Sequence, residues 1–249
     1  MKVAAIQYRP PKGDPARARQ DLVALCTEAA QAGSKLIVCP EMATAGYIWA
    51  SAEAVRPYAE APTGPTYAAL RAVAEEHRAW IVCGYVEAQE AVLYNAALVI
   101  GPSGGLVASY RKCLLYREDV HWALPGSERV LVDMGPQGTL LPAICMDLND
   151  DGLVMVLRRH QPRFLAFCTN WVDKGEDPLA YWQSRLVGWR GCFLAANSWG
   201  PDEHTGFTGL STILGSDGAL LARAPATGDH VLLATVPDAL LPVEQPSLT

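Results

Sequence analysis

The sequence lacks an apolar run longer than a β-strand, a cluster of lysine and arginine, and a closely spaced pair of cysteines. Without a long apolar run, no helix is expected to span a membrane. The 249 residues carry 20 basic against 26 acidic side chains, which argues against nucleic acid or an anionic membrane as the main partner. The N-terminal residues have no long apolar stretch like that of a signal peptide, which predicts a cytoplasmic protein.

Common metal and cofactor patterns are also missing. The seven cysteines form no CxxC pair, so a thioredoxin-like motif or a zinc ribbon has no support, and most should be free thiols. The five histidines have no metal-ligand spacing, and we predict no metal site. No glycine-rich loop matches a dinucleotide or phosphate-binding fingerprint.

One segment matches a hydrolase motif but lacks the structural context that the motif requires. Residues 101–105, GPSGG, fit the GxSxG pattern of a nucleophile elbow. That motif requires a turn from a strand into a helix. Here it joins two strand-like segments, YNAALVI and LVASYRK, and we therefore predict a hairpin turn.

Apolar strands alternate with amphipathic helices and later with hairpins, which predicts a single domain over residues 1–249. Asp14 and the proline after it predict a helix start, and Gly33 its end. This pattern is typical of stacked α and β layers around a mixed sheet system. The further predicted helices cover residues 67–77, 153–160 and 179–191. The predicted strands cover residues 3–8, 35–40, 80–86, 94–100, 106–112, 129–134, 139–145, 163–169, 192–198, 209–215, 219–224 and 230–236.

A carboxylate, an ammonium group and a thiol follow three different predicted strands. They are Glu41, Lys112 and Cys145, and each alone is more typical of a solvated loop or a packing residue. However, α/β folds assemble sites from strand ends. A thiol nucleophile needs a base, and a tetrahedral intermediate needs a cation or donor for its oxygen. We therefore predict that these three residues form one catalytic site.

The same segments resemble the nitrilase superfamily of carbon–nitrogen hydrolases. LIVCPEMATAGY is similar to the glutamate motif of that family, YRKCLLY to its lysine motif and AICMDLND to its cysteine motif. The segments KVAAIQYRP, FLAANSWG and FTGLSTILGSDGALLARA resemble its first and closing strands. The resemblance implies an α/β fold, a four-layer α-β-β-α sandwich, that needs no metal or organic cofactor and assembles as a homodimer or higher homo-oligomer.

The resemblance also implies a reaction. Glu41 would be the general base, Lys112 the oxyanion stabiliser and Cys145 the nucleophile. They would hydrolyse a non-peptide carbon–nitrogen bond of a small linear amide through an acyl-thioester, releasing ammonia or an amine. Four alternatives stay open: a nitrilase acting on a C≡N bond, an amidase of N-terminal Asn or Gln, a catalytically silent binding protein of the same fold, and a redox role for Cys145. The segments CMDLN and YRKCLLYREDVHW are similar to the N-terminal amidase branch.

Further site residues are predicted around these three. Many family members carry a second glutamate after the lysine, and Asp119 or Glu118 could fill that place. Asp150 is expected to cap the following helix. Aromatic walls with a few polar groups suit a small-molecule pocket. Its candidate substrate-binding residues are Tyr47, Trp49, Trp122, Asn170 and Trp171, with Asp147 as a possible partner for a substrate ammonium.

Overall fold

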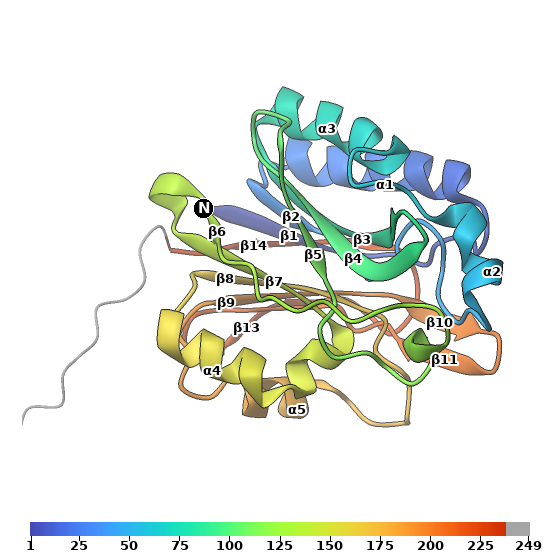
Figure 1. The fold of residues 1–249 in the computed structure, drawn as a ribbon. Coiled ribbons are helices and arrows are strands. Elements are labelled where there is room, and N and C mark those ends of the chain that lie inside the picture. The colour runs from blue at the N-terminus through green and yellow to red at the C-terminus, as the bar shows by residue number, and fades with distance from the viewer. Residues whose placement is uncertain (238–249) are drawn as a thin grey trace, which may run out of the picture.

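Two six-stranded sheets pack face to face between two pairs of helices (Figure 1). This computed structural model describes residues 1–237. Helices α1 (Pro15–Gln31) and α3 (Pro65–His77) cover the outer face of one sheet. Helices α4 (Asp151–His160) and α5 (Leu179–Arg185) cover the outer face of the other. The predicted four-layer α-β-β-α sandwich is therefore confirmed.

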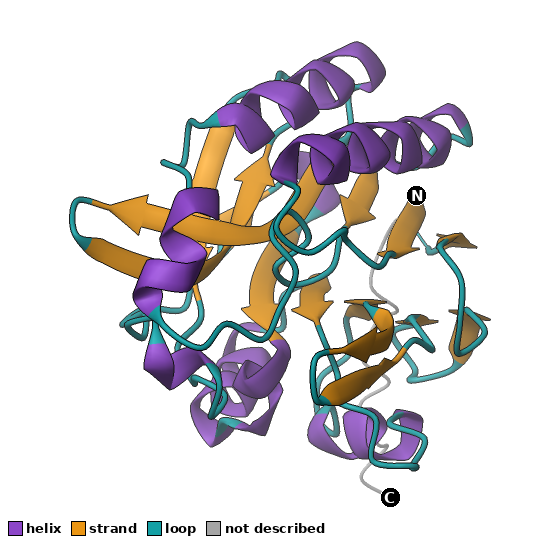
Figure 2. Ribbon diagram, turned by 90° about the vertical axis from the view of Figure 1, so that its right-hand side faces the viewer, coloured by secondary structure: helices purple, strands orange, loops and turns teal. Residues whose placement is uncertain are grey.

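The first sheet has the strand order β14-β1-β2-β3-β4-β5, in which the neighbours β1, β2 and β3 are parallel, β14 and β4 are antiparallel to them, and β5 again runs in their direction. Helices α1 and α3 link these parallel strands and lie side by side above the sheet (Figure 2). The carboxyl ends of parallel strands therefore meet at one edge. The strands are β1 (Lys2–Gln7), β2 (Leu36–Val38), β3 (Trp80–Gln89), β4 (Val92–Ile100), β5 (Leu106–Arg111) and β14 (His230–Thr235).

The second sheet has the order β13-β12-β9-β8-β7-β6, with β7, β8 and β9 parallel. A separate hairpin, β10 (Trp199–Asp202) with β11 (Thr205–Thr208), follows β9. Short helices occur at α2 (Ala52–Val55) and at 3-10 turns. The strands of the second sheet are β6 (Val132–Asp133), β7 (Thr139–Ile144), β8 (Phe164–Thr169), β9 (Cys192–Asn197), β12 (Thr212–Leu214) and β13 (Leu220–Arg223).

Most predicted elements are present, with two differences. The segment GPSGG is the turn between β4 and β5, as predicted, and the Gly101 N–H donates to the Gly105 carbonyl. Helix α5 ends at Arg185, whereas the sequence predicted a helix to residue 191. The chain turns away because Gly188 has a φ of +86° and the Trp189 indole donates to the Pro162 carbonyl at 2.8 Å. The hairpin β10–β11 was not predicted.

Alternate side chains of the central strands enter different layers of the core. In β1, Val3 and Ala5 pack between the two sheets, whereas Ala4 and Ile6 pack beneath α1 and α3. A third apolar cluster lies between the second sheet and helices α4 and α5. Both faces of these strands are therefore buried, which explains their continuous apolar sequence.

The seven cysteines are all free thiols, as predicted. Within residues 1–237, no helix combines the length and the apolar character that crossing a membrane requires.

Candidate active site

The three predicted catalytic residues follow strands of both sheets. Glu41 follows β2 and Lys112 follows β5 in the first sheet, whereas Cys145 follows β7 in the second. Lys112 Nζ donates to Glu41 Oε1 at 2.7 Å, and both side chains are fully buried. Cys145 is 7% exposed, and the charges of both other residues act on its thiol. The strand ends thus bring the carboxylate, the ammonium and the sulfur together.

A second carboxylate lies at the same ammonium group. Lys112 Nζ donates to Asp119 Oδ2 at 2.6 Å, and the Tyr47 hydroxyl donates to Asp119 Oδ1 at 2.9 Å. Glu118 instead pairs with the Arg117 guanidinium at 3.1 Å, on the exposed side of the turn. Of the two candidates for this position, the structure therefore places Asp119 at Lys112.

Burial and charge shift the pKa values of all three groups. Burial raises the pKa of the Glu41 carboxyl, and the Lys112 ammonium opposes that increase. Burial alone would lower the pKa of Lys112, but the Asp119 and Glu41 carboxylates raise it above its ordinary value. Burial, with the Glu41 carboxylate, raises the pKa of the Cys145 thiol to about 12. The geometry therefore holds a charged lysine beside a neutral thiol, with a carboxylate that readily takes up a proton.

Two asparagines fix the position of Glu41. The Asn95 amide donates to Glu41 Oε1 at 2.7 Å and to Asp119 Oδ1 at 3.2 Å. The Asn170 backbone N–H donates to Glu41 Oε2 at 2.9 Å, and its side-chain amide donates to the Glu41 carbonyl at 3.0 Å. Asn95 was not among the predicted site residues. Its signal in the sequence is an amide within the apolar strand YNAALVI, since a buried polar side chain needs a partner.

The Glu41 loop crosses β3 at a glycine. A Cβ atom on Gly84 would lie 2.3 Å from the Pro40 carbonyl oxygen and 2.6 Å from Glu41 Cα. Instead, the Gly84 N–H donates to that carbonyl at 3.1 Å. The absence of a side chain therefore allows the loop to lie directly on the strand.

Cys145 begins a 3-10 turn, and its φ of +42° is rare for a residue with a side chain. The carboxylate of Asp147 in this turn accepts the Ile144 N–H at 2.9 Å. It also accepts the N–H groups of Cys113 at 3.0 Å and Leu114 at 2.9 Å. Asp147 thus joins the cysteine turn to the segment after Lys112. The Asp147 side chain is fully buried and accepts hydrogen bonds from these N–H groups, rather than facing a substrate ammonium as expected.

A cavity of about 420 Å³ opens at the Cys145 thiol. Of the predicted wall residues, Tyr47, Asn170 and Trp171 line it. Trp49 lies outside it and packs on Tyr58, with ring centroids 4.9 Å apart. Trp122 is buried in a neighbouring apolar cluster. The sequence identified strand ends but not the directions of the aromatic side chains in the loops.

The rim of the cavity carries residues that the sequence did not single out. They include Tyr116, Lys174, Glu176 and Tyr181. The Tyr181 hydroxyl donates to the Asn149 side chain at the same rim. Within residues 1–237, no three histidine, cysteine, aspartate or glutamate side chains form a cluster that could hold a metal ion. Asp150 accepts the Gly152 N–H at 2.9 Å and caps α4, as predicted.

Comparison with known proteins places the chain in a family. The family model for carbon–nitrogen hydrolases matches residues 2–241. A protein N-terminal amidase of Schizosaccharomyces pombe is 27% identical, over 86% of this chain and 91% of that protein. An omega-amidase of Homo sapiens is also 27% identical, over 79% of this chain and 75% of its own.

Solved amidase structures share the fold. The crystal structure of an amidase from Nesterenkonia sp. superposes with a TM-score of 0.82 at 21% identity, covering 96% of this chain and 90% of that one. A mutant of the amidase from Nesterenkonia sp. AN1 has the same TM-score at 20% identity, covering 95% and 93%, and carries acrylamide added at its active site cysteine. The match of the family model along the chain shows that this protein belongs to the carbon–nitrogen hydrolases of the nitrilase superfamily.

Proposed function

We propose that the protein is a thiol amidase, with Cys145 as nucleophile, Glu41 as general base and Lys112 as oxyanion stabiliser. The observation that carries this proposal is the pair of buried hydrogen bonds from one ammonium group to Glu41 and Asp119, beside the cavity that opens at Cys145. Buried charges are costly unless they are paired. A site that keeps three of them beside a thiol is organised for chemistry rather than for stability.

The first half of the reaction forms a thioester. Glu41 takes the thiol proton as Cys145 Sγ attacks the amide carbon. This acid–base pairing is needed because the raised pKa of Cys145 leaves the thiol protonated at neutral pH. The negative charge that develops on the amide oxygen is stabilised by Lys112 and by the Met146 backbone N–H. Glu41 then gives its proton to the leaving nitrogen, and ammonia or an amine departs.

The second half releases the acid. Glu41, again ionised, takes a proton from water as the water oxygen attacks the thioester carbon. The tetrahedral intermediate is held by the same donors, and the C–S bond breaks to give a carboxylic acid. The proton on Glu41 returns to the sulfur, which restores the starting state. Asp119 supplies the second negative charge that keeps Lys112 protonated throughout.

We propose a small linear amide as substrate, because a cavity of about 420 Å³ admits a molecule of that size. A second candidate is the amide of an N-terminal Asn or Gln, which has an ammonium group near the scissile bond. Glu176 favours it, since this carboxylate lines the cavity without an ion pair in residues 1–237. The similarity to an N-terminal amidase of Schizosaccharomyces pombe points the same way.

Ammonia release from amides, nitriles and Asn- or Gln-terminal peptides tests the proposal. Cys145→Ala should abolish release, and Lys112→Ala should reduce turnover on the order of 10²-fold or more. Cys192→Ala, at the start of β9, is the matched control and should retain activity. Mass spectrometry of an acyl group trapped on Cys145 would identify the nucleophile and the acyl group together. A folded wild-type protein inert towards all three classes would instead favour the silent binding protein.

Glu176→Gln separates the two substrate classes. If the carboxylate binds an N-terminal ammonium, this change should raise KM about 10-fold for an Asn-terminal peptide, since one charge-assisted contact is lost. KM for an uncharged aliphatic amide should stay the same. An equal effect on both substrates would contradict ammonium recognition.

We also propose that the chain forms a homodimer through its second helix layer. Met155 in α4 is 68% exposed and Val187 beyond α5 is 64% exposed, although both are large and apolar. Solvent-facing apolar side chains that gather on one layer are typical of an interaction surface. The cytoplasmic location and the single domain over residues 1–249 stay predictions, and residues 238–249 of that range lie outside the described part.

A further inference from the structure

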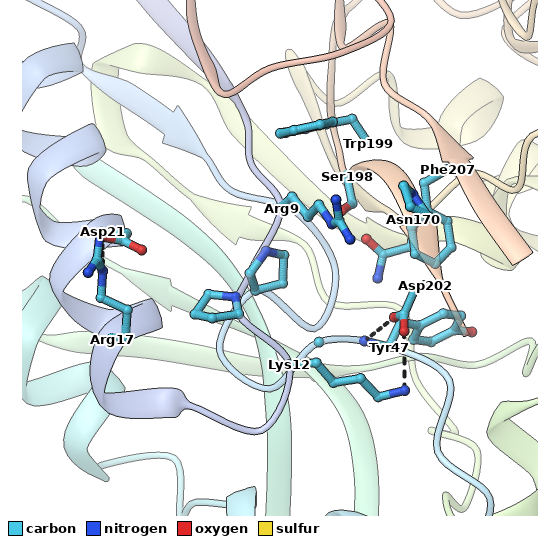
Figure 3. Close-up of a pocket in the computed structure, with 14 residues that line it drawn as sticks. Arg9, Lys12, Arg17, Asp21, Tyr47, Asn170, Ser198, Trp199, Asp202 and Phe207 are labelled. Carbon is cyan, nitrogen blue, oxygen red and sulfur yellow. Dashed lines mark hydrogen bonds and ion pairs between the residues drawn. The ribbon is translucent and has the colours of Figure 1, made fainter. Parts of the chain in front are cut away.

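Figure 3 shows the residues that line a second cavity, which has a volume of about 500 Å³. It lies between the segment that leads from β1 into α1 and the hairpin β10–β11. Tyr47 and Asn170 belong to the walls of both cavities. A ligand in this second cavity would therefore lie directly next to residues that hold Asp119 and Glu41.

Two of the three cations on its walls are already paired. Lys12 Nζ lies 3.1 Å from Asp202 and 2.9 Å from Glu203. Arg17 Nε lies 2.8 Å from Asp21 on the opposite wall, as Figure 3 shows. Their charges are largely neutralised by these partners, so neither provides a free counter-ion for a ligand.

Arg9 is the exception. No acidic side chain among residues 1–237 forms an ion pair with its guanidinium, which extends between Trp199 and Asn170 (Figure 3). The guanidinium carbon lies 5.6 Å from the Trp199 ring centre, within the range of a cation–π contact. Arg9 Nη1 also lies 3.3 Å from the position that a Cβ atom on Gly200 would take. The side chain thus lies along β10, with a charged group available to the cavity.

We propose that this second cavity binds a small organic carboxylate, with Arg9 as its counter-ion. A guanidinium presents parallel N–H donors that match the two oxygens of a carboxylate. With Asp21 and Asp202 paired to Arg17 and Lys12, the walls keep one unpaired positive charge, which favours a ligand with a single negative charge.

The remaining walls indicate an organic body rather than an inorganic ion. The apolar side chains are Pro10, Pro11, Trp199, Pro201 and Phe207. Burial of a ring or a short aliphatic chain against them adds to the contact with Arg9. Carboxylates are also the acid products of the proposed reaction, and the inference rests on that proposed function only in this choice of ligand class.

Calorimetric titration of benzoate into the whole protein, alkylated at Cys145 with iodoacetamide, tests the inference. Alkylation places a carbamidomethyl group on the sulfur in the catalytic cavity, and peptide mass spectrometry would verify that Cys145 carries the adduct. Benzoate should still bind, and Arg9→Ala should weaken binding about 10-fold or more, since a charge-assisted contact is lost. Arg9→Lys keeps the charge without the forked donors and should give an intermediate affinity. Arg159→Ala, at an exposed position of α4, is the matched control and should bind like the wild type.

Three results would overturn the inference: no benzoate binding to the alkylated protein, equal binding by Arg9→Ala, or equal binding of neutral benzamide. Binding that disappears on alkylation would place benzoate in the catalytic cavity alone. Failure of the proposed function would look different, because ammonia release would then persist in Cys145→Ala while benzoate binding remained dependent on Arg9.

Discussion

One ammonium group donates hydrogen bonds to two carboxylates at the bottom of the catalytic cavity. Glu41 and Asp119 each lie within 2.7 Å of Lys112 Nζ, and no part of the three side chains is exposed to solvent. Two neighbouring carboxylates without a cation would raise each other's pKa strongly. Lys112 therefore favours the ionised form of Glu41, against the effect of burial, in addition to its proposed task at the substrate oxygen.

The electrostatic interaction between Asp119 and Glu41 predicts how Asp119→Asn changes the pH dependence of kcat/KM. As the proposed base, Glu41 would act only when ionised, and burial raises its pKa above the ordinary 4.5, so activity should fall with acidity at a pH above that value. The negative charge of Asp119 contributes to this increase. Its removal should lower the pKa of Glu41 and move the acidic limb of kcat/KM to lower pH. A profile that shifts to higher pH would contradict this assignment of the base.

The left-handed backbone of Cys145 predicts an unusual order of stability. At most positions alanine is more stable than glycine, but a Cβ atom at positive φ costs about 1 kcal/mol. Since Cys145 has a φ of +42°, Cys145→Gly should be more stable than Cys145→Ala by about that amount. Urea unfolding of the two variants measures the difference in their free energies of unfolding. If alanine were the more stable residue, the turn would not be strained.

The sequence predicts the strand ends well, but it does not predict how side chains in the loops between them are directed. Strands β2, β5 and β7 precede Glu41, Lys112 and Cys145, and the carboxyl ends of these three strands fix where the three residues lie. This part of the site follows from strand order. The wall residues do not, because loop side chains take their direction from tertiary contacts. Trp49 packs on Tyr58, for example, and the sequence carries no sign of that pairing.

The close contact between β3 and the Glu41 loop predicts that Gly84→Ala is damaging. The new methyl group would overlap the Pro40 carbonyl, and the loop would have to move away from the strand. Displacement of a catalytic group by about 1 Å can cost 10²-fold in rate, and we expect a loss of that order in kcat/KM. Gly105→Ala is the control, since its nearest neighbour would be Ser103 Oγ at 3.8 Å. If both variants kept wild-type activity, the loop would be more adaptable than its packing indicates.

At the scale of the whole molecule, each sheet contributes part of the site. Glu41 and Lys112 follow strands of the first sheet, and Cys145 follows a strand of the second. The apolar core between the sheets therefore fixes the catalytic distances as well as the fold. Asn170, at the end of β8, crosses this boundary by donating to Glu41. Core packing and reactivity are coupled in this architecture.

The exposed apolar side chains of the outer helix layer predict the oligomeric state of the protein in solution. If α4 and α5 meet the same surface of a second copy, Met155→Glu places a charge inside that contact. Light scattering coupled to size-exclusion chromatography should then give a dimer for the wild type and a monomer for the variant. Val107→Glu, at a 48% exposed position on β5, should leave the dimer intact. A wild-type monomer would contradict the proposed surface.

The division of the site between two sheets also affects when the site can assemble during translation of the chain. Glu41 and Lys112 leave the ribosome before Cys145, and β14, which pairs with β1, leaves last among the strands of residues 1–237. A nascent chain therefore contains no assembled hydrolase until almost all of these strands have been translated. A chain that ends before β7 is complete would carry the carboxylate and the ammonium group without the sulfur.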